Sequence, residues 1–82
     1  MSTSKLLPQY AVILHNDSTN SFESVVKALM DVCSVSIEGG KTLALEAHEY
    51  QKTKLTTTHF ELAETYQHLL EQKGLKVTLE RQ

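Results

Sequence analysis

The residues best suited to chemistry are a polar pair that follows an apolar run and one histidine further along the chain. Asn16 and Asp17 come directly after the apolar run of residues 10–14, and His48 closes a segment with helical spacing. A carboxylate, an amide oxygen and a neutral imidazole are three hydrogen-bond acceptors. Together they suit a protonated α-amine, which offers three N–H donors and one positive charge. These residues therefore indicate recognition of a free amino terminus.

An apolar side chain next to such an amine would need a hydrophobic pocket. Five apolar residues on the flanking segments can line one: Phe22, Val25, Ala44, Ala47 and Leu75. Each acceptor also has a purely structural interpretation. Asn16 and Asp17 favour a turn, and a histidine at a helix end is stabilised by the helix dipole. The spacing alone leaves both interpretations open.

Common catalytic and metal-binding motifs are absent from the sequence. It has no glycine-rich phosphate loop, no GxSxG, no HExxH and no cysteine pair. Its four histidines, His15, His48, His59 and His68, lack the spacing of metal ligands. A small hydrolase with His48 as base and Asp17 as its orienting partner stays an alternative, although no nucleophile is placed beside them. The sequence predicts a binding protein, not an enzyme, with no metal and no cofactor.

Length and charge narrow the class of protein further. The chain has 82 residues, a net charge of −2 and a pI near 6.0, which predicts one domain with a shallow site. The sequence contains no run of basic residues that would predict binding to nucleic acid. A nucleic-acid-binding module of similar fold stays an alternative. No apolar run approaches the roughly 20 residues of a membrane span. The single cysteine, Cys33, is expected to be a buried small hydrophobe in a reducing compartment. We expect a cytoplasmic monomer, with the plastid stroma as the alternative location.

The first half of the chain predicts a strand and two helices. Residues 1–8 are expected to form a short flexible lead, and residues 9–82 a single domain. Residues 10–14 predict a central strand and residues 15–21 a turn. Asn20 and Glu23 resemble a capping box for a helix whose buried stripe is Phe22, Val25, Val26, Leu29 and Cys33. A second helix is expected from Ser36, with an inner side made of Ile37, Ala44, Ala47 and His48. Gly39 and Gly40 in its first turn weaken that prediction.

The second half predicts two more strands around a third helix. Residues 52–58 alternate polar and β-branched residues, which favours a half-exposed strand. Thr58 and Glu61 form a capping-box pattern for a helix with the inner face Leu62, Ala63, Tyr66, Leu69 and Leu70. Gly74 predicts a left-handed stop, and residues 75–79 a final strand. The order β-α-α-β-α-β predicts an α+β fold of two layers, a three-stranded sheet with helices on one face.

Four blocks of the sequence together resemble the ClpS family. They are residues 10–17 (YAVILHND) with the helix around Val25 and Val26, residues 43–48 (LALEAH), residues 63–65 (AET) and residues 78–80 (TLE). Members of that family are adaptors that hand N-degron substrates to a Clp-type AAA+ unfoldase and its protease. The resemblance implies that Asn16 and Asp17 hold the α-amine of a substrate and that His48 completes its hydrogen bonds.

The resemblance also implies roles for the apolar residues and for one surface. Val25, Ala47 and Leu75 would line the side-chain pocket, and Phe22 would stand at its gate, where the family often has methionine. Ala44 and Ala47 replace larger residues and would open space. Glu61 would lie on the surface presented to the unfoldase, where Tyr66 replaces a basic residue that is common in the family.

Several departures from the family pattern bear on function. Ser18 replaces a second acidic residue, and Asn20-Ser21 replace a Thr-Pro pair, so the amine site is expected to be less negative. Tyr50, Gln51 and Lys52 follow His48 and Glu49 where the family has a glycine turn. The lead before the strand is shorter than the extension that family members use in delivery. The alternative function is therefore a regulator that docks on the unfoldase and modulates its substrate choice without efficient delivery.

Overall fold

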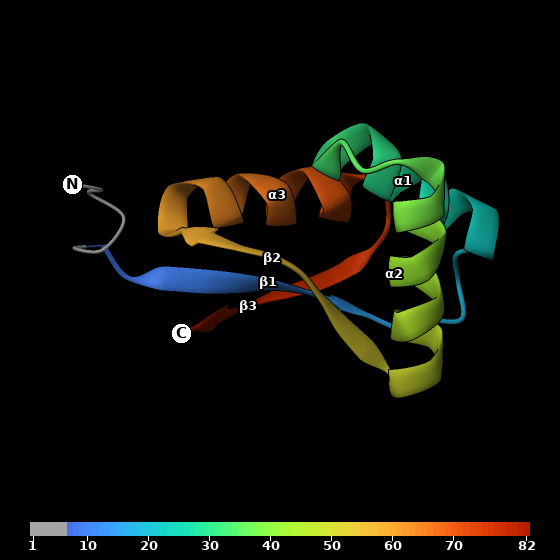
Figure 1. The fold of residues 1–82 in the computed structure, drawn as a ribbon, viewed down its shortest axis with the longest axis horizontal. Helices are drawn as coiled ribbons and strands as arrows, with labels where there is room; N and C mark the ends of the chain where they lie inside the picture. Colours follow the sequence, from blue (N-terminus) through green and yellow to red (C-terminus); the bar gives the residue numbers. More distant parts are fainter. Residues whose placement is uncertain (1–6) are drawn as a thin grey trace.

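The computed structural model describes residues 7–82 and contains the six predicted elements in the predicted order. They are β1 (Gln9–His15), α1 (Phe22–Cys33), α2 (Ile37–Tyr50), β2 (Lys52–His59), α3 (Phe60–Gln72) and β3 (Lys76–Arg81). The predicted α+β class is confirmed, with α3 lying along the sheet and α1 and α2 together at one end of it (Figure 1). Residues 1–6 of the predicted lead lie outside the described residues.

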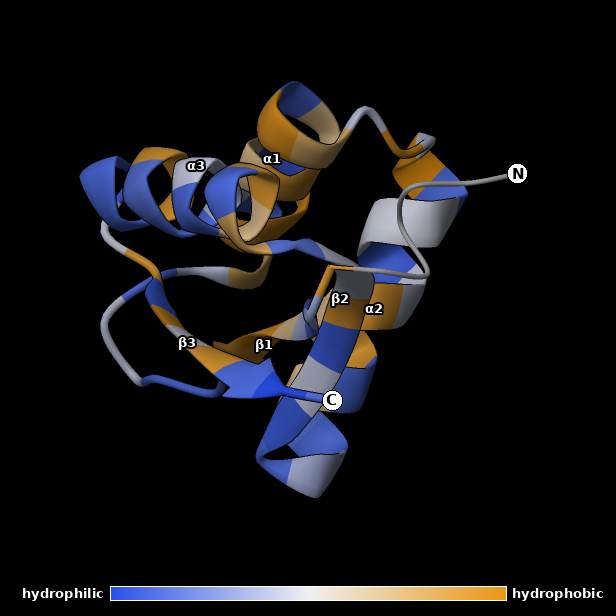
Figure 2. Ribbon diagram, turned by 90° about the vertical axis from the view of Figure 1, so that its left-hand side faces the viewer, coloured by the Kyte–Doolittle hydropathy of each residue, from blue (hydrophilic) through white to orange (hydrophobic). Residues whose placement is uncertain are grey.

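The sheet has β1 at its centre, as the apolar run predicts. Its strand order is β2-β1-β3, and β1 pairs antiparallel with both neighbours. Residues 11–14 are all buried, and a strand pairs along each edge of β1. Figure 2 shows this hydrophobic stretch in the middle of the sheet. His15, the last residue of β1, pairs with Lys52 and Lys76, the first residues of β2 and β3. The loop that follows β1 therefore emerges beside the turns that precede both outer strands.

Two details set how the helical layer meets the sheet. The register of β1 with β2 shifts between Val12, which faces Thr56, and Ile13, which faces Lys54. This bulge increases the local twist of the sheet. Near the start of β1, the rings of Tyr10 and Phe60 pack edge to face with their centroids 5.0 Å apart. This contact fixes the start of α3 over the strand.

Gly40 explains why a glycine pair is tolerated inside α2. A Cβ atom at Gly40 would lie 3.2 Å from Val26 Cγ1 and 3.3 Å from the Val26 carbonyl oxygen on α1. The two helices approach each other closely at this point, and any side chain would push them apart. The close packing of α1 on α2 compensates for the low helix propensity of the glycine.

Both predicted capping boxes are wrong by one residue. The N-cap of α1 is Ser21, whose hydroxyl accepts a hydrogen bond from the Ser24 N–H at 3.1 Å, and not Asn20. The N-cap of α3 is His59, whose Nδ1 lies 3.5 Å from the Leu62 nitrogen. Thr58 remains in β2, because its pairing with Tyr10 extends the strand past the predicted helix start. Asn20 has a different partner, described below.

The predicted inner faces of the helices were too wide. Phe22, Ile37, Leu62 and Leu69 were expected inside, but their side chains are 43%, 46%, 38% and 39% exposed. A three-stranded sheet is narrow, so each helix buries only a thin line of residues. Those lines are Val26, Ala28 and Leu29 on α1, Gly40, Ala44 and Ala47 on α2, and Ala63 and Leu70 on α3.

Two further predictions need correction, the burial of Cys33 and the start of the final strand. Cys33 is only partly buried, although it packs against the core, and this burial raises the pKa of its thiol. The final strand begins at Lys76 and not at Leu75. Leu75 lies in the turn before β3, where its N–H donates to the Leu70 carbonyl at 3.1 Å, and its side chain is buried.

Gly74 ends α3 in the left-handed region, as predicted, with φ of 86°. Gly74→Ala should therefore lower the free energy of unfolding by about 1 kcal/mol, because an L side chain is strained there. Gly39→Ala is the matched control. Its Cβ would meet only ordinary contacts at 3.4 and 3.5 Å, and it should stabilise the chain by about 0.5 kcal/mol through helix propensity. Urea denaturation of both variants measures this, and equal effects at the two glycines would contradict it.

Candidate functional site

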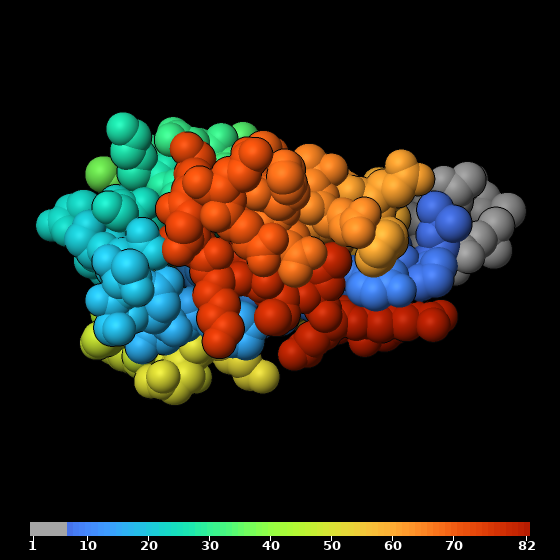
Figure 3. Space-filling view, turned by 180° about the vertical axis from the view of Figure 1, so that it is seen from behind, coloured from blue at the N-terminus to red at the C-terminus, as the bar shows by residue number. Residues whose placement is uncertain are grey.

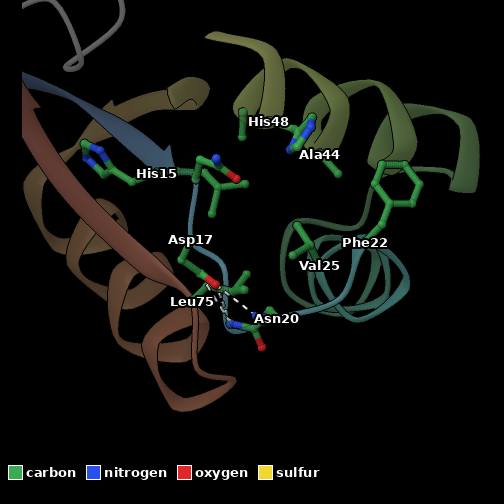
Figure 4. Close-up of a pocket in the computed structure, with 11 residues that line it drawn as sticks. His15, Asp17, Asn20, Phe22, Val25, Ala44, His48 and Leu75 are labelled. Atoms are coloured by element: carbon green, nitrogen blue, oxygen red, sulfur yellow. Dashed lines mark hydrogen bonds between the residues drawn. The ribbon is translucent and has the colours of Figure 1, made fainter. Parts of the chain in front are cut away.

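A cavity of about 290 Å³ opens where the loop after β1 meets α1, α2 and the turn before β3. All eight residues predicted for the amine site and its pocket line it: Asn16, Asp17, Phe22, Val25, Ala44, Ala47, His48 and Leu75. In Figure 4, His48 and Ala44 project from α2 on one side, and Asp17 and Asn20 lie on the loop opposite. Residues from four separate segments therefore share one hollow.

A backbone hydrogen bond brings the loop of residues 16–20, here called the acceptor loop, beside the end of α2. The Asn16 N–H donates to the Gln51 carbonyl at 2.8 Å. Gln51 is the C-cap of α2 and adopts a left-handed conformation with φ of 72°. A residue other than glycine therefore occupies this left-handed position. The bond holds Asn16 next to the last helical turn, which carries His48.

The carboxylate of Asp17 organises its own loop. Its Oδ1 accepts hydrogen bonds from the backbone N–H groups of Thr19 at 2.8 Å and Asn20 at 2.9 Å. The Asn20 N–H is the main cause of a lowered pKa for Asp17; burial opposes the shift and the Thr19 N–H adds to it. Asp17 is thus ionised at neutral pH. The turn interpretation of this residue is confirmed by these hydrogen bonds, and its carboxylate also lines the cavity.

The lowered pKa of Asp17 predicts a sign for the pH dependence of stability. The charged form makes hydrogen bonds only in the folded chain, so its contribution is fully present above the ordinary pKa of 3.8 and is lost as pH falls through the lower folded value. Wild type should be more stable than Asp17→Asn near neutral pH, and this advantage should shrink below about pH 4. Chemical denaturation across that range measures it. An advantage that grows towards acid would contradict this assignment.

The apolar wall of the cavity comes from small and medium side chains. Ala44 and Ala47 are buried on α2, one turn apart, and Leu75 is buried in the turn before β3. Val25 of α1 is half-buried and also lines the cavity. Phe22 is exposed in the first turn of α1, and Figure 4 shows its ring at the side of the hollow. The short side chains of these two alanines leave room for an apolar group.

The electrostatic character of the cavity favours a cation. Among the described residues that line it, Asp17 carries a negative charge and none is a lysine or an arginine. The C-terminal turn of α2, which carries His48, adds the negative end of a helix dipole. A charged amine is therefore better accommodated here than an anion.

Three lining residues were not predicted for the site: Leu14, His15 and Asn20. All three flank Asn16 and Asp17 in sequence, and that proximity was the available signal. The His15 Nε2 is 2.6 Å from the Thr78 hydroxyl oxygen of β3, a contact that no local pattern predicts.

The residues predicted to face an unfoldase lie on α3. Glu61 is exposed in the first turn and lines a shallow groove with Glu64 and Glu71. Tyr66 is half-buried and packs against the hydrophobic core. Neither lines the cavity described above.

The described part of the chain has neither a metal-binding cluster nor a membrane-spanning helix. Within residues 7–82, no cluster of three or more His, Cys, Asp or Glu side chains could hold a metal ion. Over the same residues, no helix has both the length and the apolar character needed to cross a membrane.

Comparison with known proteins identifies relatives over most of the chain. The family model for the ATP-dependent Clp protease adaptor protein ClpS matches residues 5–78. The ClpS adapter protein of Prochlorococcus marinus is 35% identical over 75 residues, covering 90% of this chain and 71% of that protein. A chloroplastic ClpS adapter of Chlamydomonas reinhardtii is 36% identical over 74 residues, covering 89% of this chain and 46% of that protein.

A solved structure agrees with these sequence relatives. Agrobacterium tumefaciens ClpS2 bound to L-phenylalaninamide has a TM-score of 0.89 and 25% identity, covering 92% of this chain and 98% of the other. The family match, the curated relatives and this fold agree with each other. The chain belongs to the ClpS family of ATP-dependent Clp protease adaptors, which are adaptor proteins and not enzymes.

Proposed function

We propose that this chain binds the free amine and the bulky hydrophobic first residue of N-degron substrates and delivers them to a Clp-type AAA+ unfoldase. The observation that carries this proposal is that one cavity joins Asn16, Asp17 and His48 to an apolar wall. L-Phenylalaninamide, the ligand of the related Agrobacterium protein, has the same two parts: a free α-amine and an apolar side chain.

Each half of the cavity supplies a different part of the binding free energy. Asn16, the Asp17 carboxylate and the His48 imidazole accept the three N–H groups of the amine, and the negative charge of Asp17 complements its positive charge. The side chain of the first residue enters the space beside Ala44 and Ala47, where burial of apolar surface is favourable. Phe22 covers the entrance. Neither half alone distinguishes an amino terminus from other cations or other apolar groups.

Delivery requires a second surface, which we place on α3. Glu61 is exposed there and is available to a partner that offers cations. Tyr66 packs on the core and supplies no basic group, and this favours a second candidate, a regulator that docks on the unfoldase without efficient delivery. Degradation of a model N-degron substrate separates the two, because delivery speeds substrate loss and regulation slows it or leaves it unchanged.

The proposed setting is a monomer in the cytoplasm, with the plastid stroma as the alternative. The chloroplastic relative from Chlamydomonas supports that alternative. Sedimentation of the purified chain measures the oligomeric state directly.

A panel of fluorescent peptides that differ only at residue one tests the binding proposal. Fluorescence anisotropy should give tight binding for Leu, Phe, Tyr or Trp at that position and little for Gly, Ser or Asp. The reason is that a small or charged side chain gains nothing from the apolar wall. Equal affinity across the panel would show that the apolar wall does not bind the side chain of the first residue.

A further inference from the structure

One side-chain amide joins the acceptor loop to the turn between α3 and β3. The Asn20 Nδ2 donates to the Gly74 carbonyl oxygen at 2.7 Å. The same nitrogen lies 3.4 and 3.3 Å from the two carboxylate oxygens of Asp17. Figure 3 shows the loop and this turn side by side on one face of the molecule. A residue 54 positions away in sequence is thereby tied to the carboxylate of the amine site.

The orientation of this amide follows from its partners. A carbonyl and a carboxylate are both acceptors, so the NH₂ group and not the oxygen must face them. The Asn20 amide packs against Gly74, since a Cβ atom there would lie at ordinary contact distances of 3.6 Å from Asn20 Oδ1 and 3.8 Å from Asn20 Nδ2.

The acceptor loop is held at two points, one from each neighbouring turn. Its Asn16 end is bonded to Gln51 after α2, and its Asn20 end is bonded to Gly74 after α3. Gly74 directly precedes Leu75, which is buried and lines the cavity. The Asn20 amide thus connects the charged part of the cavity to part of its apolar wall.

We propose that Asn20 is a positioning residue of the amine site, which sets the Asp17 carboxylate and Leu75 at a fixed separation. This inference rests on the proposed function and adds a residue that acts through Asp17. Asn20 is one of the departures from the family pattern, in which a Thr-Pro pair is usual. The asparagine supplies the donor that reaches the Gly74 carbonyl.

Asn20→Ala removes the amide and keeps the backbone N–H that bonds to Asp17. The first measurement needs no ligand: amide hydrogen exchange of Thr19 and residue 20 should become about fivefold faster, because one of the loop's two attachments is lost. The second is anisotropy with a peptide that begins with Phe. Its affinity should fall about fivefold to tenfold.

A double-mutant cycle separates positioning from general stabilisation. In an Asp17→Asn background, Asn20→Ala should lower the affinity less than about twofold, because a residue that acts through Asp17 has little left to position. Gln67→Ala is the matched control. It removes a similar amide-to-carbonyl bond, from Gln67 Nε2 to the Val77 carbonyl at 3.1 Å. It should cost comparable stability and leave peptide affinity unchanged.

These outcomes distinguish a failure of the positioning role of Asn20 from a failure of the proposed function. Unchanged affinity in Asn20→Ala, with wild type binding normally, overturns the positioning role and leaves the proposed function intact. An equal loss in both Asp17 backgrounds also overturns it. If wild type binds no amine-bearing peptide while the loop exchange still responds, the proposed function fails and Asn20 only stabilises the loop.

Discussion

His48→Ala should lower the affinity for a peptide with a free amine and an initial Phe about tenfold. A hydrogen bond to a charged group contributes about 1.5 kcal/mol or more, and 1.4 kcal/mol corresponds to a factor of ten. We take the lower end of that range because the His48 side chain is exposed. Fluorescence anisotropy with the purified variant measures the loss.

His68→Ala is the matched control for this substitution. It removes another exposed imidazole, on α3 and outside the cavity lining, and its affinity should stay within about twofold of wild type. His48→Gln keeps an acceptor on the same turn and should recover part of the loss. If His48→Ala binds as tightly as His68→Ala, the imidazole has no role in holding the amine.

Ala44→Leu should reduce binding of peptides that begin with Trp or Tyr about tenfold to a hundredfold, and should affect Leu peptides less. Ala44 is 5% exposed and lines the cavity, so three added carbons occupy space that a large first residue would need. One methylene of misfit is worth roughly 1–3 kcal/mol. The prediction is a change in rank order among first residues, which the peptide panel reads directly.

Thr42→Leu controls for the added apolar surface. Thr42 is exposed on the same helix and does not line the cavity, so the order of preference should match that of wild type. A uniform loss for all first residues in Ala44→Leu would indicate a distorted helix instead of a filled pocket. Thermal denaturation of both variants shows whether stability accounts for it.

Element type and order were predictable because local patterns agreed with the tertiary structure. The apolar run at residues 10–14 identified the central strand, and Gly74 identified the end of α3. Helix boundaries and faces were less predictable. Thr58 has good capping chemistry, but pairing with Tyr10 keeps it in β2. The exposure of Phe22 and Ile37 depends on how little surface a narrow sheet offers, and periodicity does not contain that information.

The candidate site was partly predictable for a similar reason. Asn16, Asp17 and His48 have side chains whose chemistry is visible in the sequence, and the resemblance to ClpS placed them together. Asn20 was assigned to a helix cap because its nearest sequence partner, Glu23, fits a local motif. Its actual partner, Gly74, is 54 residues away. The antiparallel pairing of β1 with β3 brings those two turns together.

The most direct test compares two peptides that are identical except for acetylation of the first residue. Acetylation removes the positive charge and two of the three N–H donors, so acceptors at the cavity lose their partners at about 1–3 kcal/mol each. We predict that the peptide with the free amine binds and that its acetylated twin binds at least about a hundredfold more weakly. Equal affinity for the two would show that the cavity does not recognise an amino terminus.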